Sequence, residues 1–208
     1  MEGKTVYNQT MKNSWLRKAY FAIEKYRLQR YIFCGDHVYC EKGTVNEQLY
    51  FKWGNELVNN GMVVYCEDAE SLLKTVGDGG LKMIAIAKDE ISHEKIMQQA
   101  CSFGYFDVVR GERLHYELTR KGANKAAALE FVSDMLGVDM QNVLAIGDST
   151  NDLEMIRSAG IGVAMGNPMH ELLAVADDVT LPIEQHGVAH AIQKYVFQNE
   201  PCCAAVVG

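Results

Sequence analysis

The chain has 208 residues and a mass of 23.2 kDa, enough for one large domain or two small ones. A hydrophobic fraction of 48% and a charged fraction of 23% are typical of globular proteins and exclude a disordered or low-complexity chain. The formal net charge is −7, which argues against nucleic acid as a partner, because binding to phosphate backbones needs a basic face.

No apolar run approaches the roughly 18 residues of a membrane span. The first residues also lack the basic-then-apolar order of a signal peptide. Six cysteines occur without C-x-x-C spacing, and Cys34, Cys40 and Cys66 lie in apolar, strand-like runs that favour buried structural thiols. These features together predict a soluble, cytoplasmic protein with no membrane partner.

The first half of the chain alternates short strand-like runs with amphipathic helices, a pattern typical of α/β proteins. Strands are predicted at 4–8, 31–34, 37–40, 62–66, 83–87, 106–110 and 114–118. Helices are predicted over about 15–26, with Ser14 as N-cap, and over about 45–59, 67–76 and 92–103. Gly35-Asp36 indicates a hairpin turn between two of these strands. This half therefore predicts an α+β domain with helices on one face of its sheet.

The second half has a different pattern. An apolar helical stripe over 128–136 is followed by continuous apolar runs at 143–146 and 161–165, as expected of strands buried on both faces of a parallel sheet. We place a domain boundary near Glu117, which divides the chain into 1–116 and 117–208.

The strongest functional signal is Gly147-Asp148-Ser149-Thr150-Asn151-Asp152, directly after the first of these apolar strands. Ligands of open α/β sheets bind beyond the carboxyl ends of the strands, so Asp148 should project into that crevice, with Asp152 one helical turn on. Two carboxylates suit a hard cation such as Mg²⁺. Asn151 and the N–H groups of the helix start suit a phosphate oxygen. The alternative is an ordinary strand-to-helix turn.

Four segments together resemble the haloacid dehalogenase-like (HAD) phosphatases, in particular their Cof-type branch with a large α/β cap. The segment 144–156 resembles motif IV, and 121–125 resembles the lysine segment of motif III. Two later segments, 159–168 and 185–192, resemble the strand and loop after motif IV and the start of the C-terminal helix. The resemblance implies an α+β cap at 1–116 and the C-terminal part of a Rossmann-like parallel sheet at 117–208.

The resemblance also implies residue roles. Asp148 would be a Mg²⁺ ligand, and Asp152 would support the metal site. Lys125 would be the catalytic lysine that neutralises charge on the transferring phosphoryl group, and Asn167 would border the phosphate. This role of the lysine is consistent with phosphoryl transfer, which depends largely on positioning and charge stabilisation. The resemblance further implies a small phosphorylated metabolite as the substrate.

One element of the family pattern is missing from this sequence. HAD phosphatases attack phosphate with an aspartate of an N-terminal D-x-D motif, and this chain contains no D-x-D and no motif II serine or threonine segment. Two interpretations remain: an Mg²⁺-dependent phosphatase whose nucleophile comes from elsewhere, or a truncated, non-catalytic paralogue that binds phosphate or metal. We expect the chain by itself to be inactive, because covalent catalysis needs a nucleophile.

The absence of the motif I segment also affects how the chain is expected to assemble. In the family, the strand that matches 143–146 pairs with the absent motif I strand, so its edge should be open here. We therefore predict a homodimer or higher oligomer through roughly residues 118–165. The alternative is that the tail at 196–208 or a cap element folds over the gap.

Overall fold

The computed structural model describes residues 5–26, 29–43, 60–87, 89–110 and 114–197. Internal contacts divide the chain into two compact units, Met1–Ala123 and Asn124–Gly208. The boundary proposed near Glu117 falls inside a strand, β6 (His115–Arg120), so the division lies after the end of that strand.

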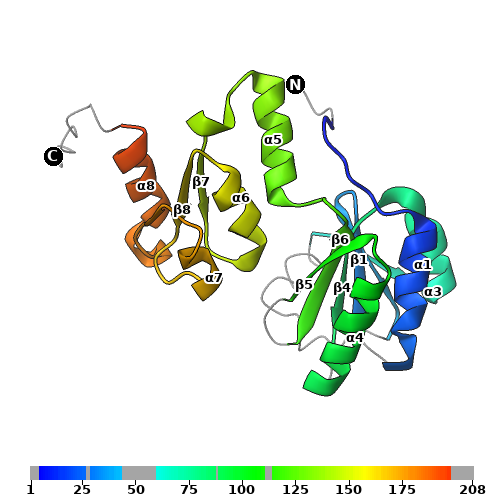
Figure 1. Cartoon of the computed structure of the whole chain (residues 1–208). Helices are drawn as coiled ribbons and strands as arrows, with labels where there is room; N and C mark the ends of the chain where they lie inside the picture. Colours follow the sequence, from blue (N-terminus) through cyan, green and yellow to red (C-terminus); the bar gives the residue numbers. More distant parts are fainter. Residues whose placement is uncertain (1–4, 27–28, 44–59, 88, 111–113, 198–208) are drawn as a thin grey trace. The chain divides into compact units, whose positions relative to one another are not determined.

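The first unit is built on a six-stranded sheet in the order β3-β2-β1-β4-β6-β5 (Figure 1). Its strands are β1 (Gln29–Cys34), β2 (His37–Glu41), β3 (Val63–Cys66), β4 (Gly80–Ile86), β5 (Phe106–Arg110) and β6 (His115–Arg120). All neighbouring strands are antiparallel except β2 and β3, which are parallel. The unit is thus the predicted α+β arrangement.

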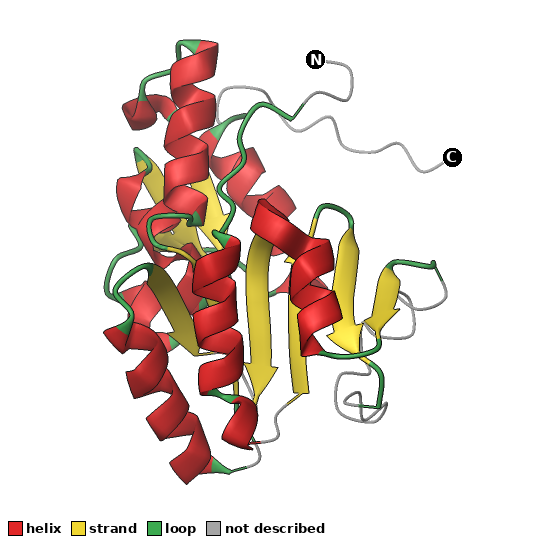
Figure 2. Ribbon diagram, turned by 90° about the vertical axis from the view of Figure 1, so that its right-hand side faces the viewer, coloured by secondary structure: helices red, strands yellow, loops and turns green. Residues whose placement is uncertain are grey.

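Helices α1 (Asn13–Ala22), α3 (Ala69–Val76) and α4 (Glu90–Ser102) pack against this sheet (Figure 2). The core between them is a large apolar cluster that includes Leu16, Ile32, Leu72, Met83, Ile96 and Leu118. A smaller cluster on the other face of the strands contains Tyr31, Val38, Cys40, Ile84 and Ile86. Because side chains alternate along a strand, neighbours such as Tyr31 and Ile32 belong to different clusters.

Several local predictions for this unit are confirmed and others are wrong. The turn at Gly35 closes the β1–β2 hairpin, where its φ of 56° suits a glycine. The strand expected at 4–8 is absent from residues 5–10, and only Met11 makes an isolated bridge, to Gly80. Ser14 does not cap α1, whose N-cap position is Lys12. The helix expected at 45–59 lies outside the described residues.

The second unit contains a parallel sheet in the order β7-β8-β9, with β7 (Leu144–Gly147), β8 (Ile161–Ala164) and β9 (Asp178–Val179). Its helices are α5 (Lys125–Leu136), α6 (Leu153–Ser158), α7 (His170–Leu173) and α8 (Gly187–Tyr195). Helix α6 packs on β7 and β8, and α8 also contacts β7 (Figure 1). The fold class is therefore α/β, with a Rossmann-like parallel sheet in the second unit and a cap-like α+β arrangement in the first, as predicted.

Strand β7 stands at one end of this sheet. Among the described residues it pairs only with β8, so its other edge carries backbone N–H and C=O groups without a strand partner. An edge of this kind is a template for association with another strand. Within the described residues, no strand pairs with this edge, which is the edge that the sequence predicted to be open.

Candidate functional site

The site lies where β7 ends. A cavity of about 550 Å³ opens there, and its polar lining includes Lys125, Asp148, Asp152 and Asn167. Four of the five side chains predicted from the sequence thus share one cavity. The fifth, Asn151, is not part of the lining but accepts a hydrogen bond from the Lys125 Nζ at 3.4 Å. All five belong to the second unit.

The loop after β7 is organised by Asp152. Its Oδ2 accepts the backbone N–H of Asp148 at 3.0 Å and that of Ser149 at 3.2 Å. The second of these bonds belongs to a capping box, in which the Ser149 side chain also accepts a backbone bond from position 152. The carboxylate therefore closes the turn and fixes the direction in which the loop leaves the strand.

The other oxygen of Asp152 binds lysine. Its Oδ1 lies 2.5 Å from the Lys125 Nζ, and the aspartate side chain is 3% exposed against 52% for the lysine. Burial would raise the pKa of Asp152, but the Lys125 ammonium and the N–H groups of Ser149 and Asp148 outweigh it and lower that pKa. The buried group is therefore an ionised carboxylate, paired with a cation that reaches solvent.

Helix α5 delivers Lys125 to this position. Asn124 caps the helix by accepting the N–H of Ala127 at 2.9 Å, so Lys125 is the first helical residue. Its side chain then reaches the loop that follows β7.

Asn167 comes from the loop after β8. It adopts a left-handed backbone conformation, with φ of 67°, which asparagine tolerates better than most residues. The preceding Gly166 approaches Pro182 so closely that a Cβ there would lie 2.3 Å from the proline nitrogen. A close backbone approach therefore positions the loop that carries Asn167.

The cavity also has an apolar side that the sequence did not predict. It is lined by Ile146, Met155, Met165, Ile183 and Val188, with Glu184 as a further carboxylate. The stretch 185–192 was recognised as the start of a helix, but nothing in its pattern placed it beside the end of β7. Ile183 is 75% exposed and Val188 is 48% exposed, so this part of the apolar side is open to solvent, whereas Met165 is buried.

The carboxylates around the cavity determine how a metal ion could be bound there. Asp148 is exposed and lines the cavity, so its carboxylate is open to a cation. Both oxygens of Asp152 already accept hydrogen bonds. Within the described parts of the chain, no group of three or more His, Cys, Asp or Glu side chains could hold a metal ion. These residues fit an Mg²⁺ that keeps most of its waters rather than a closed protein cage.

Comparison with known sequences defines the class of the protein. A family model of haloacid dehalogenase-like hydrolases matches residues 1–192. The chain therefore belongs to the haloacid dehalogenase-like hydrolases. Among the described residues, no helix has both the length and the apolar character needed to cross a membrane.

Curated relatives of the chain include several phosphatases. It is 39% identical over 112 residues to the 5-amino-6-(5-phospho-D-ribitylamino)uracil phosphatase YcsE of Bacillus subtilis, a match that covers 54% of this chain and 45% of the relative. It is 43% identical over 79 residues to the phosphoglycolate phosphatase of Methanothermobacter thermautotrophicus, covering 38% of this chain and 36% of the relative. The matches span less than half the length of either relative.

Solved structures share the fold over nearly the whole chain. A haloacid dehalogenase-like hydrolase from Bacteroides thetaiotaomicron matches with a TM-score of 0.75 and 27% identity, over 92% of this chain and 70% of that one. Another from B. subtilis has a TM-score of 0.77 and 21% identity, over 94% of this chain and 74% of that one. Each neighbour thus contains more than a quarter of its length without a counterpart here.

Proposed function

We propose that the second unit carries half of an Mg²⁺-dependent phosphatase site for small phosphorylated metabolites, and that this chain alone does not turn over substrate. The observation that carries the proposal is the gathering of Lys125, Asp148, Asp152 and Asn167 around one cavity at the end of β7. A cation and amide groups beside a carboxylate suit an anionic ester and its metal counter-ion.

Lys125 and the two asparagines would act on the phosphate. The Lys125 ammonium is about half exposed, so it can neutralise a phosphoryl oxygen while Asp152 holds it in place. The Oδ1 of Asn151 accepts from Lys125 and from the Ser149 hydroxyl, at 3.4 and 2.6 Å, which leaves its amide N–H groups to donate. Asn167 offers a second amide from the loop after β8.

Asp148 would hold the cation directly, and Asp152 would support it by fixing the loop and the lysine. When bound, Mg²⁺ would supply positive charge that offsets the charge of a phosphate ester. With one open carboxylate the affinity should be weak, since affinity for hard cations rises with the number of charged ligands.

Turnover needs a nucleophile that this sequence does not contain, because no D-x-D occurs in it. The relatives' names support a phosphate monoester of a small metabolite as the ligand class, since they act on a phosphorylated ribityl compound and on phosphoglycolate. The second candidate function is a non-catalytic module that binds phosphate or metal and self-associates, which the open edge of β7 favours.

We also infer a cytoplasmic location and assembly into a homodimer or higher oligomer. The described cysteines, Cys34, Cys40, Cys66 and Cys101, are all free thiols, as is usual in a reducing compartment. Association is supported by the open edge of β7, which lies inside the range 118–165 given from the sequence.

Titration calorimetry with inorganic phosphate and with Mg²⁺ tests the proposed site. Lys125→Met should weaken phosphate binding at least about tenfold, which corresponds to about 1.4 kcal/mol, with little effect on Mg²⁺. Asp148→Asn should abolish the Mg²⁺ signal. Lys121→Met, an exposed lysine outside the cavity, is the matched control. Equal phosphate binding by the Lys125 and Lys121 variants would refute the assigned role.

A further inference from the structure

The cavity at the end of β7 has one charged lining residue that the proposed site does not use. Three carboxylates and one ammonium line it, those of Asp148, Asp152, Glu184 and Lys125. Asp152 is paired with Lys125 at 2.5 Å, and Asp148 is the group proposed for the cation. Glu184 forms no ion pair or hydrogen bond with another residue that the structure describes, so within that part of the chain nothing offsets its charge.

The turn that carries Glu184 is held in place by close backbone contacts. In the 3₁₀ turn Ile183–Gln185, the N–H of the last residue donates to the carbonyl oxygen of Pro182 at 3.0 Å. Pro182 also lies against Gly166, where a Cβ would be 2.3 Å from the proline nitrogen. Because Asn167 follows that glycine, the loop proposed to bind phosphate and the turn that carries Glu184 are fixed against each other.

The cavity offers space for more than a phosphate group. Its volume of about 550 Å³ lies within the range of pockets that hold small molecules. Around Glu184 the lining is apolar and consists of Ile146, Met155, Met165, Ile183 and Val188. A phosphate ester held by Lys125 would therefore extend its organic part along this apolar lining, where it would meet the carboxylate of Glu184.

A fixed carboxylate at that place discriminates between esters by their charge. A binding site rejects a wrong ligand when it places like charges against each other. A carboxylate on the organic part would meet that of Glu184, whereas a hydroxyl would donate a hydrogen bond to it and an ammonium would form an ion pair with it. The lining contains more carboxylates than cations, which adds to the repulsion of a second anionic group.

We propose that Glu184 is a specificity-determining residue that selects phosphate monoesters with an uncharged or cationic organic part and excludes those that carry a carboxylate. The inference rests on the proposed function, because it requires the phosphoryl group to be held by Lys125 and Asn167. It goes further in naming the substrate class, which is a phosphorylated polyol or amine. Glu184 would act on the affinity for the organic part and not on the phosphoryl group.

Three phosphate esters of similar size test the selection. Phosphoethanolamine carries an ammonium, hydroxyethyl phosphate a hydroxyl and phosphoglycolate a carboxylate. In titration calorimetry of the full chain with Mg²⁺, we expect affinity to fall in that order, by at least about tenfold from first to last. Glu184→Gln keeps the size of the side chain without its charge and should bring the three affinities to within about threefold of one another. Inorganic phosphate should bind equally to both proteins.

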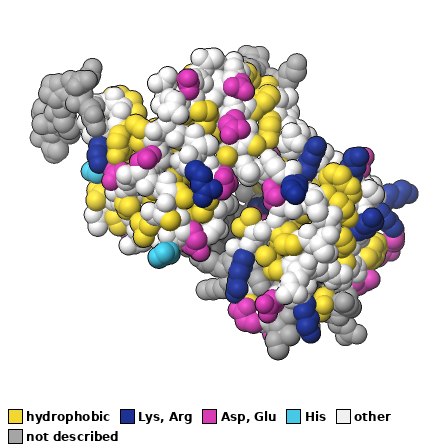
Figure 3. Space-filling view, viewed as in Figure 1, with side chains coloured by type: hydrophobic (Ala, Val, Ile, Leu, Met, Phe, Trp, Pro, Cys, Tyr) yellow, Lys and Arg dark blue, Asp and Glu magenta, His cyan; other side chains and the backbone are white. Residues whose placement is uncertain are grey.

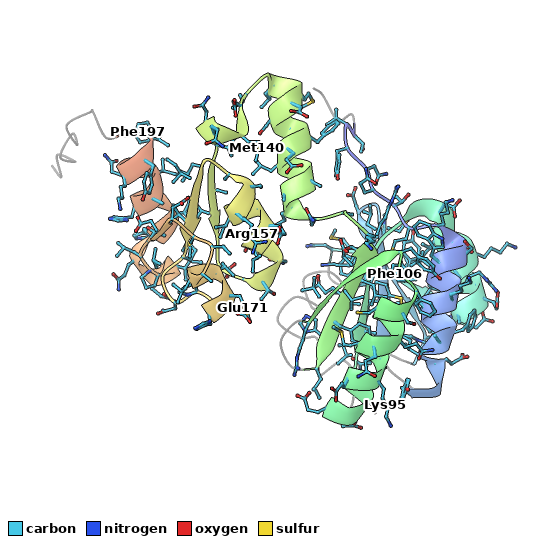
Figure 4. The ribbon with its side chains drawn as sticks, viewed as in Figure 1. Lys95, Phe106, Met140, Arg157, Glu171 and Phe197 are labelled. Atoms are coloured by element: carbon cyan, nitrogen blue, oxygen red, sulfur yellow. The ribbon has the colours of Figure 1, made fainter. Side chains whose placement is uncertain are left out.

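The control removes a negative charge away from the cavity, because several acidic side chains lie on the face of the second unit that Figure 3 shows. Glu171→Gln, on helix α7 (Figure 4), should keep the parent's range of affinities. Phosphate binding with the same range in the parent and in Glu184→Gln would overturn the selection alone. A parent that does not bind phosphate would overturn the proposed site and the selection together. Loss of the Mg²⁺ signal in Glu184→Gln would assign this carboxylate to the cation and would also overturn the selection.

Discussion

The Nζ of Lys125 lies 2.5 Å from the Oδ1 of Asp152, although 27 residues separate the two in the sequence. The lysine opens helix α5, and the aspartate closes the loop after β7. A nearly buried carboxylate is thus balanced by a cation that still reaches the cavity. The pair joins two elements of the second unit and leaves one charged group available to a ligand.

Removal of the lysine should destabilise the protein in a pH-dependent way. The pKa of Asp152 is lowered in the folded protein, so its stabilisation is complete above its ordinary pKa and is lost as pH falls through the folded value. In Lys125→Met the ammonium is gone, so burial should raise that pKa. We expect the free energy of unfolding at pH 7 to fall by about 1–3 kcal/mol. The difference from the parent should close only as pH falls below the ordinary aspartate pKa of about 3.9 and through the lowered folded pKa of the parent, where the carboxyl is protonated in both proteins. Urea unfolding at pH 7 and at about pH 3, below the ordinary aspartate pKa, measures this difference, with Lys121→Met as control.

A methyl group at Gly147 should disrupt the same pair. A Cβ there would lie 2.4 Å from the Cβ of Asp152, so the aspartate must shift. Gly147→Ala is expected to destabilise the protein by about 1–3 kcal/mol, the usual cost of overpacking, and to weaken phosphate binding. Thermal unfolding and phosphate titration measure the two effects. Binding at the parental level would show that the position of Asp152 does not control the lysine.

In the first unit, the main electrostatic feature is the Arg30–Glu41 pair. The Arg30 Nη2 lies 2.6 Å from the Glu41 Oε1, which also accepts the Tyr20 hydroxyl at 2.7 Å. Arg30 is 6% exposed, and its guanidinium stacks on the Tyr20 ring, 3.9 Å from the centroid. Because breaking a buried pair leaves an uncompensated charge, Glu41→Ala should lower the free energy of unfolding by about 3–5 kcal/mol.

The matched control for that substitution is Glu117→Ala. Glu117 pairs with Lys82 at 3.2 Å, and both side chains are partly exposed, so its loss should cost at most about 1 kcal/mol. Urea unfolding of the two variants gives the comparison. Similar losses for both would mean that the buried network contributes no more than a surface pair.

The sequence predicted best what depends on neighbouring residues. Gly35 set the β1–β2 turn, and the strand before Asp148 was placed within a residue of β7. Helix starts were predicted less accurately. Ser92 was expected to open α4, but Asp89 is the N-cap residue of that helix, and its side chain accepts the backbone N–H of Ser92. Both residue types are good caps, so only the backbone conformation distinguishes them.

Features that depend on distant contacts were not predictable. Gly187 approaches Leu181 so closely that a Cβ would lie 1.8 Å from its carbonyl oxygen, a contact that helps place α8 beside the cavity. Nothing in the local pattern around Ile183 and Val188 indicates that approach. The polar half of the candidate site was therefore found from one motif and a family resemblance, and the apolar half only from the structure.

Asp178 should anchor the end of α8. Its Oδ2 accepts the Lys194 ammonium and the Tyr195 hydroxyl, both at 2.6 Å, and these bonds lower its pKa to about 2 from 3.8. Asp178→Asn should therefore lower the melting temperature at pH 7. The difference from the parent should close as pH falls from about 4 to about 2, where the aspartate of the parent is protonated. Glu171→Gln, exposed on α7, is the control and should melt with the parent across that range.

The central claim is that this chain holds a phosphatase half-site without its nucleophile. The most direct test is an assay of the purified chain with Mg²⁺ against p-nitrophenyl phosphate, sugar phosphates and phosphoglycolate, with Asp148→Asn in parallel. We predict no phosphate release above background from either protein, because no D-x-D is present to form the phosphoenzyme. Turnover by the parent that disappears in Asp148→Asn would contradict the account and would require a nucleophile among residues not assigned that role.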